Sequence, residues 1–158
     1  RSIVPGLSVV VLLVISLLPV PHIGPVTPFL PLIGMFYWIV MRPDLMPRVA
    51  IFVFGLLEDA LTGLPLGTHA LVYLLFHAAV MNQRRFLVGR AFWLFWSGFA
   101  LVALVAALLI WLLASLLQGN ILALNVFLAS CAISAALFPL TVGVMIQIQR
   151  GFVGVAER

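Results

Sequence analysis

Long apolar runs alternate along the whole chain with short clusters of polar residues, glycine and proline. The clusters are PVPHIGPVTP, MRPDLMPR, TGLPLG, NQRRFLVGR and QGN, and they separate six apolar runs. Apolar runs of this kind, bounded by helix-breaking residues, are typical of membrane helices. The pattern therefore predicts six helices, at roughly residues 3–19, 27–41, 48–63, 66–82, 90–117 and 121–148.

The composition indicates that lipid surrounds these helices. Hydrophobic residues make up 65% of the 158 residues and charged residues only 8%, whereas a soluble domain has roughly 25% charged residues. A soluble core of this size cannot bury so much apolar surface, so lipid has to cover the remainder. The sequence has no hydrophilic stretch long enough for an extramembrane domain. We therefore expect one all-α, multi-pass membrane domain over residues 1–158.

The basic residues predict the orientation of this domain. All eight are arginines, and six helices place them at the two termini, in the second loop and in the fourth loop, which all lie on one side. The positive-inside rule makes that side cytoplasmic, with both termini inside. A few arginines at membrane edges form no basic patch with interleaved aromatic residues, so nucleic acid is excluded as a partner, and anionic lipid headgroups are expected instead. The arginines are Arg1, Arg42, Arg48, Arg84, Arg85, Arg90, Arg150 and Arg158.

The third and fourth predicted helices are short. About 15 residues at a rise of 1.5 Å give roughly 22 Å, which is less than the hydrocarbon core of about 30 Å. These two helices either cross a locally thinned bilayer or form a re-entrant hairpin. Both arrangements leave the arginines on one side, so the charges do not distinguish them. The fifth and sixth helices are long enough to cross with a tilt.

Half of the four acidic residues, Glu58 and Asp59, lie inside the third apolar run. An acid at the centre of a membrane helix costs roughly 2.5–3.5 kcal/mol, so neighbouring helices have to support this one. Asp59 shares a helix face with Gly55 and Gly63, and small residues allow another helix to approach closely. We therefore predict that Asp59 is buried and partnered, and that Glu58, on the side of Phe54 and Leu61, faces the outer interface.

The turn after this helix suggests a partner for Asp59. Gly63 and Gly67 flank a tight turn, and His69 and Tyr73 lie four residues apart on one side of the fourth helix. The first amides of a helix and its positive dipole end suit a carboxylate. We predict a hydrogen-bonded contact between the third and fourth helices, in which Asp59 meets the start of the fourth.

Catalytic, metal-binding and cofactor-binding patterns are not found in the sequence. The two histidines of the fourth helix, His69 and His77, are eight residues and about 12 Å apart along the axis, too far to share a metal. No HExxH motif, phosphate-binding glycine loop or nucleophile–base pair is present. A proton or ion relay would need further ionisable groups along its path. The acidic pair therefore favours a structural or partner-binding role, with transport chemistry as the alternative.

The ordered features of residues 28–71 resemble the signature region of the bacterial rod-shape-determining protein MreD family. The resemblance consists of prolines before the second helix, an aromatic pair, a proline loop, and then glycine, acid, glycine and glycine-x-x-alanine-leucine. The length, the six-helix layout and the closing stretch LFPLTVGVMIQIQR are similar as well, whereas Glu58 is not part of the pattern. The matching residues are Pro28, Pro31, Tyr37, Trp38, Pro43, Gly55, Asp59, Gly63, Leu66, Gly67, Ala70 and Leu71.

This resemblance implies a non-catalytic scaffold of the cell-elongation machinery in the bacterial inner membrane. Such proteins bind MreC and, with it, link the MreB cytoskeleton to the glycosyltransferase RodA and its penicillin-binding transpeptidase. The family is also similar in fold to the substrate-binding subunits of energy-coupling-factor vitamin transporters. The alternative function is therefore such a small-molecule-binding subunit, for which His22, Glu58, His69 and Asn120 lie near the outer face.

Overall fold

The computed structural model describes residues 3–18 and 26–153, and all regular elements in these ranges are helices. The predicted all-α fold and the six long helices are confirmed. The predicted sites at Arg1, His22 and Arg158 lie outside the described ranges. The elements are α1 (Ile3–Ser16), α2 (Leu30–Met41), the 3-10 helix η1 (Pro43–Leu45), α3 (Arg48–Thr62), α4 (Thr68–Leu87), α5 (Phe92–Gln118), α6 (Leu124–Ile148) and the π-helix η2 (Gln149–Val153).

The helix ends differ most from the prediction at α4. This helix has 20 residues and continues through Arg84 and Arg85, so at 1.5 Å per residue it is about 30 Å long. Its polar last turn was predicted to be a loop. Arg84 donates from Nε to the carbonyl oxygen of Val40 at 2.7 Å, and this contact with α2 holds the extra turn in place.

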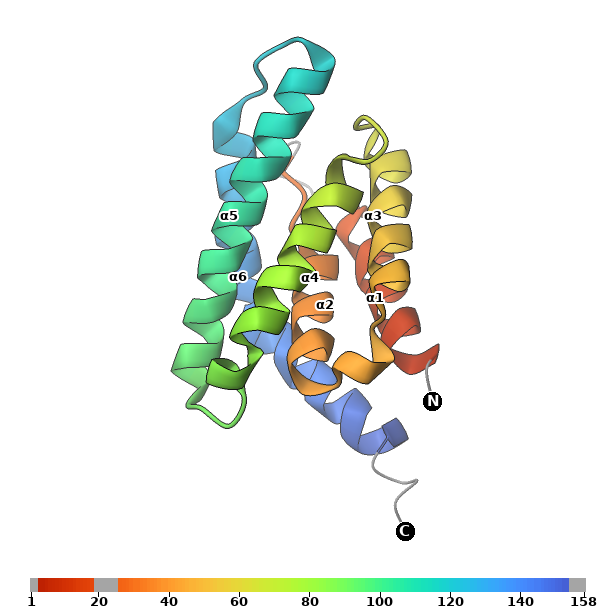
Figure 1. Ribbon diagram of the computed structural model, residues 1–158, viewed down its shortest axis with the longest axis vertical. Helices are drawn as coiled ribbons and strands as arrows, with labels where there is room; N and C mark the ends of the chain where they lie inside the picture. Colours follow the sequence, from red (N-terminus) through yellow and green to blue (C-terminus); the bar gives the residue numbers. More distant parts are fainter. Residues whose placement is uncertain (1–2, 19–25, 154–158) are drawn as a thin grey trace.

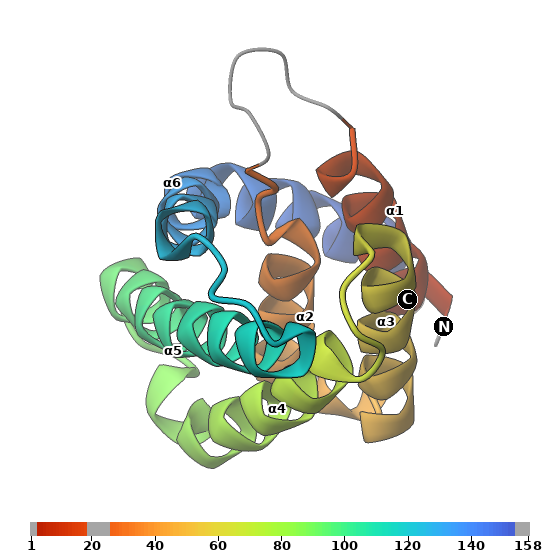
Figure 2. The same ribbon diagram turned by 90° about the horizontal axis from the view of Figure 1, so that it is seen from above.

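Helix α2 forms the centre of the bundle. Seen from above, the other five long helices surround it (Figure 2), and all its residues from Leu30 to Val40 are buried. The ring of Phe36 contacts the rings of Phe76 on α4, of Phe95 and Phe99 on α5, and of Phe138 on α6. The core therefore joins α2 to the helices on either side of it.

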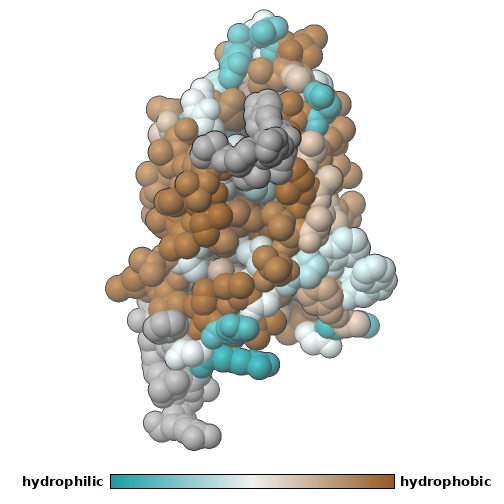
Figure 3. All heavy atoms as spheres, turned by 180° about the vertical axis from the view of Figure 1, so that it is seen from behind, coloured by the Kyte–Doolittle hydropathy of each residue, from teal (hydrophilic) through white to brown (hydrophobic). Residues whose placement is uncertain are grey.

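The outside of the bundle is largely apolar. Figure 3 shows hydrophobic side chains over most of one face, and α5 alone exposes Leu101, Leu104, Val105, Leu108 and Leu112. Helices α5 and α6 are long and apolar enough to cross a membrane, whereas α1 and α2 are shorter apolar helices. A surface of this kind is stable against lipid but not against water.

The described charges separate along the long axis of the bundle. The α2–α3 connection, the α4–α5 connection and the end of α6 lie together at the lower end of Figure 1, and they carry the described arginines. Glu58 and Asp59 lie near the opposite end of α3, close to the α3–α4 turn. The fold therefore separates these acids from the described arginines by most of the length of α3.

Candidate functional site

Asp59 is fully buried and is held by the first turn of α4. Its Oδ2 accepts a hydrogen bond from the backbone N–H of Gly67 at 2.8 Å. Its Oδ1 accepts from the backbone N–H of His69 at 2.9 Å and from Nδ1 of the same residue at 2.8 Å. The predicted contact between Asp59 and the start of the fourth helix is confirmed. The carboxylate satisfies amides that have no partner within their own helix.

Glycines make this contact possible. A Cβ atom on Gly55 would lie 2.4 Å from Cα of Ala70, so α3 and α4 touch backbone to backbone at this point. At the turn, Gly63 and Gly67 have φ angles of 72° and 102°, in the left-handed region that favours glycine. The predicted close approach at Gly55 and the tight glycine turn are both confirmed.

Glu58 does not face the outer interface, and that prediction was wrong. The residue is 5% exposed, and its Oε2 accepts a hydrogen bond from the hydroxyl of Tyr73. Leu61, on the same side of α3, is 54% exposed, whereas Phe54 is buried. The prediction considered only the position of Glu58 on its own helix, whereas α4 lies close enough for the hydroxyl of Tyr73 to reach Glu58.

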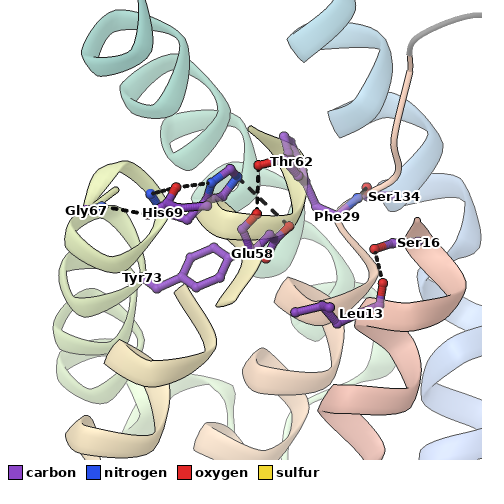
Figure 4. Close-up of polar contacts among 10 residues, drawn as sticks. Leu13, Ser16, Phe29, Glu58, Thr62, Gly67, His69, Tyr73 and Ser134 are labelled. Carbon is purple, nitrogen blue, oxygen red and sulfur yellow. Dashed lines mark hydrogen bonds and ion pairs between the residues drawn. The ribbon is translucent and has the colours of Figure 1, made fainter. Parts of the chain in front are cut away.

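His69 lies between the two carboxylates. Its Nδ1 is 2.8 Å from Oδ1 of Asp59, and its Nε2 is 3.9 Å from Oε1 of Glu58. Figure 4 shows Glu58, His69 and Tyr73 converging between α3 and α4. The sequence-predicted residues Gly55, Glu58, Asp59, Gly63, Gly67, His69 and Tyr73 therefore form one connected α3–α4 cluster.

A pocket of about 300 Å³ adjoins this cluster. Glu58 and His69 contribute buried polar side chains to its wall. The remaining wall comes from the end of α3 and the turn after it, the residue after α1, the segment before α2 and the first turns of α6. Phe29 and Thr62 can be seen beside the acid–histidine pair in Figure 4. The lining residues are Leu17, Thr27, Phe29, Glu58, Leu61, Thr62, Leu64, His69, Val126, Phe127 and Ser130.

The walls contributed by Phe29, Phe127 and Ser130 were not predicted. The backbone N–H of Phe29 donates to Oγ of Ser134 at 2.7 Å, and this bond fastens the segment before α2 to α6 across more than a hundred residues. The only sequence signal was the proline-rich break before the second helix. Of the residues proposed for an outer binding face, Asn120 does not line the pocket, and His22 lies outside the described residues.

The cluster can accept hydrogen bonds and hold charge. No group of three potential metal ligands was found among the described residues, and each fully buried side-chain nitrogen or oxygen in them has a hydrogen-bond partner. The α3–α4 joint is therefore satisfied by its own hydrogen bonds, and two of its residues, Glu58 and His69, line the pocket.

The chain matches no protein-family model, no curated protein and no solved structure. Its function therefore has to be inferred from the sequence pattern and from the geometry of this cluster.

Proposed function

We propose that this chain is a non-catalytic scaffold of the bacterial cell-elongation complex, a protein of the MreD type that binds MreC in the inner membrane. Through MreC it would join RodA, the penicillin-binding transpeptidase and MreB. The observation that carries this proposal is the convergence of the MreD-like motif on one joint. The contact between α3 and α4 depends on four residues of this motif, namely Gly55, Asp59, Gly63 and Gly67.

A rigid joint suits a scaffold because partner binding is strongest when the surface does not have to be ordered on contact. The buried carboxylate, two left-handed glycines and a backbone contact hold α3 and α4 in one arrangement. The exposed sides of these helices are apolar, with Phe52, Val53 and Leu57 on α3 and Leu71 and Leu75 on α4. We propose this surface as the site for the transmembrane helix of MreC or the segment next to it.

The membrane arrangement that we propose has six transmembrane helices with both termini in the cytoplasm. Two observations support it, namely the apolar outer surface and the gathering of the described arginines at one end of the bundle. The acid–histidine cluster would then lie toward the outer face. At the cytoplasmic end, the arginines would meet anionic lipid headgroups and cytoskeletal partners.

Co-purification tests the scaffold function. The tagged chain is expressed with MreC, extracted in mild detergent and captured, and the retained MreC is quantified. We expect the unchanged chain to retain MreC, and Asp59→Ala to retain at least fivefold less. Asp44→Asn serves as the control, since it also removes one carboxylate but lies in a surface pair with Arg42. An unchanged chain that never retains MreC rules the proposal out.

A second candidate function is the small-molecule-binding subunit of an energy-coupling-factor transporter. The pocket beside Glu58 and His69 favours it, because the pocket combines apolar walls with a few buried polar atoms, as ligand sites do. Mass spectrometry of the chain purified from native membranes tests this function. A stoichiometric vitamin-type molecule would support it, and a chain that carries MreC but no small molecule would reject it.

A further inference from the structure

Two partly accessible atoms of the residues that line the pocket, Oε1 of Glu58 and Nε2 of His69, make no hydrogen bond to the described part of the chain and face each other. Oδ1 of Asp59 already accepts a backbone N–H, so the ionised carboxylate accepts the Nδ1 hydrogen of His69, and Nε2 is left for the pocket. Oε2 of Glu58 accepts from Tyr73, and Oε1 is left as well. Nε2 and Oε1 are 3.9 Å apart, and their side chains are 4% and 7% exposed.

The hydroxyl groups of the pocket also offer acceptors. Ser130 gives its hydrogen to the carbonyl oxygen of Val126 at 2.9 Å, and Thr62 gives its hydrogen to the carbonyl oxygen of Glu58 at 2.7 Å. Each hydroxyl oxygen therefore has lone pairs, but no hydrogen, left for a further hydrogen bond. The pocket adjoins the C-terminal end of α3 but also the first turns of α4 and α6, so the helix dipoles favour neither sign of charge.

The charge of the cluster is negative when both acids are ionised. Glu58 and Asp59 then carry two negative charges, and a His69 whose Nδ1 donates and whose Nε2 accepts carries none. The described arginines lie at the opposite end of the bundle. Because an uncompensated charge away from water is costly, a cation in the pocket would stabilise the cluster.

We propose that this pocket binds an organic cation with a primary ammonium group, which donates to Oε1 of Glu58 and to Nε2 of His69. An ammonium group has three N–H donors and no acceptor, so it can donate to both of these atoms, which lie 3.9 Å apart. The apolar part of the molecule would pack against Phe29, Leu64 and Phe127, and about 300 Å³ accommodates a small ligand of this class. The site does not require MreC, and it is the same pocket that favours the second candidate function.

Calorimetric titration of the purified chain in phosphatidylcholine nanodiscs, without MreC, tests the site with phenethylamine as the probe. We expect saturable binding of one phenethylamine per chain. The uncharged 2-phenylethanol and the N,N,N-trimethyl derivative, which has the charge but no N–H, should each bind at least tenfold more weakly. Equal binding of either analogue would overturn the proposal, because it would show that the N–H donors or the charge do not matter.

Variants then assign the binding to the pocket. Glu58→Gln should weaken phenethylamine binding at least tenfold, and the control Asp44→Asn should change it less than twofold. Val126→Phe keeps every charge but places a larger side chain in the pocket, and it should also abolish binding. Circular dichroism and thermal unfolding show whether each variant is folded. If Glu58→Gln does not fold, the binding measured for Val126→Phe tests whether phenethylamine occupies the pocket. Binding as tight as that of the unchanged chain in either folded variant overturns the site.

A lipid headgroup and a free amine share this ammonium chemistry, and a second measurement separates them. The chain is reconstituted with equal amounts of phosphatidylethanolamine and phosphatidylcholine and is examined by native mass spectrometry. Retention of phosphatidylethanolamine alone, lost in Val126→Phe, identifies the lipid as the source. Retention of neither lipid, together with phenethylamine binding, identifies a free amine. If neither lipid nor phenethylamine binds, the proposal is wrong.

Discussion

At the scale of single residues, Asp59 has the most demanding position in the molecule. Its two oxygens accept from the N–H groups of Gly67 and His69 and from the imidazole of His69, and the side chain has no contact with solvent. Hydrogen bonds to a charged group contribute about 1.5–3 kcal/mol each. The joint between α3 and α4 therefore depends on a carboxylate rather than on any polar group of the same shape.

Asp59→Asn tests that dependence. The amide NH₂ of the asparagine would face a backbone N–H on one side, so at least one hydrogen bond is lost and the negative charge is lost with it. We expect a loss of about 2–3 kcal/mol in the free energy of unfolding, the size of one charged hydrogen bond. Denaturant unfolding in detergent micelles measures it. The control Asp44→Asn, in an exposed ion pair, should cost at most about 1 kcal/mol.

Residue-level reasoning succeeded for Asp59 and failed for Glu58. Asp59 lies on a stripe with Gly55 and Gly63, and small residues on one helix face reveal where a second helix approaches. Glu58 lies 100° away beside Leu61, and the sequence gives no sign that Tyr73 reaches across to it. The burial of an acidic residue can be predicted from its own helix only when small residues on the same face show where the partner helix packs.

At the scale of the elements, the packing of α3 against α4 depends on the close approach of their backbones at Gly55. A Cβ atom at Gly55 would meet the Cα and backbone nitrogen of Ala70 at 2.4 and 2.5 Å, and backbone atoms cannot turn aside as a flexible side chain can. Any side chain at position 55 forces the helices apart and lengthens the hydrogen bonds of Asp59.

Gly55→Ala should therefore destabilise the protein by about 1–3 kcal/mol, as expected for overpacking. Gly143→Ala is a matched control, because Gly143 also lies inside a helix but an added Cβ meets nothing within 4 Å. That control should be neutral or should stabilise by up to about 1 kcal/mol through helix propensity. Thermal unfolding in detergent measures both variants, and equal melting temperatures would contradict the close-contact interpretation.

The α3–α4 turn depends on the left-handed backbone conformation of its glycines rather than on close packing. Gly67 has a φ angle of 102° and donates its N–H to Asp59, and an added Cβ would meet no other atom. Gly67→Ala should cost roughly 1–2 kcal/mol, from the left-handed backbone alone. Since Gly119 has a similar positive φ of 65° but no contact with the acid cluster, the comparison Gly119→Ala should weaken stability by a similar amount without reducing retention of MreC.

The elements themselves were largely predictable, and the exceptions have physical causes. Breaker residues and apolar runs predicted six helices, because both are local properties of the chain. The end of α4 was predicted too early, since its last turn is polar and is held by the Arg84 contact with Val40 on α2. A contact between elements that are far apart in sequence leaves no local pattern.

At the scale of the whole molecule, the pocket shows what the sequence could not reveal. Its walls come from α1, the segment before α2, α3, α4 and α6, and no motif joins them. The bond between Phe29 and Ser134 that brings two of these walls together links residues with no shared periodicity. The placement of the arginines, unlike the pocket, could be predicted from the sequence. Successive helices run in opposite directions, and this alone puts the described arginines at one end of the bundle (Figure 1).

The proposed topology makes a prediction that also separates a full crossing from a re-entrant hairpin. Cys131 is first replaced by Ala, which leaves the described residues free of cysteine, and single cysteines are then placed at Asp44, Leu66 or Asn120. Six full crossings put positions 66 and 120 outside and position 44 inside. A membrane-impermeant maleimide added to intact cells should therefore label Leu66→Cys and Asn120→Cys at once, and Asp44→Cys only after permeabilisation.

Leu66 is the informative position because it lies at the α3–α4 turn and is 72% exposed. Helix α4 is about 30 Å long at 1.5 Å per residue, whereas the 15 residues of α3 give only about 22 Å. A full crossing therefore requires the bilayer to thin beside α3, at a cost of a fraction of a kcal/mol per Å. If Asn120→Cys is labelled from outside but Leu66→Cys is not, α3 and α4 form a re-entrant hairpin. The acid cluster would then lie within the membrane, beyond the reach of a partner outside the cell.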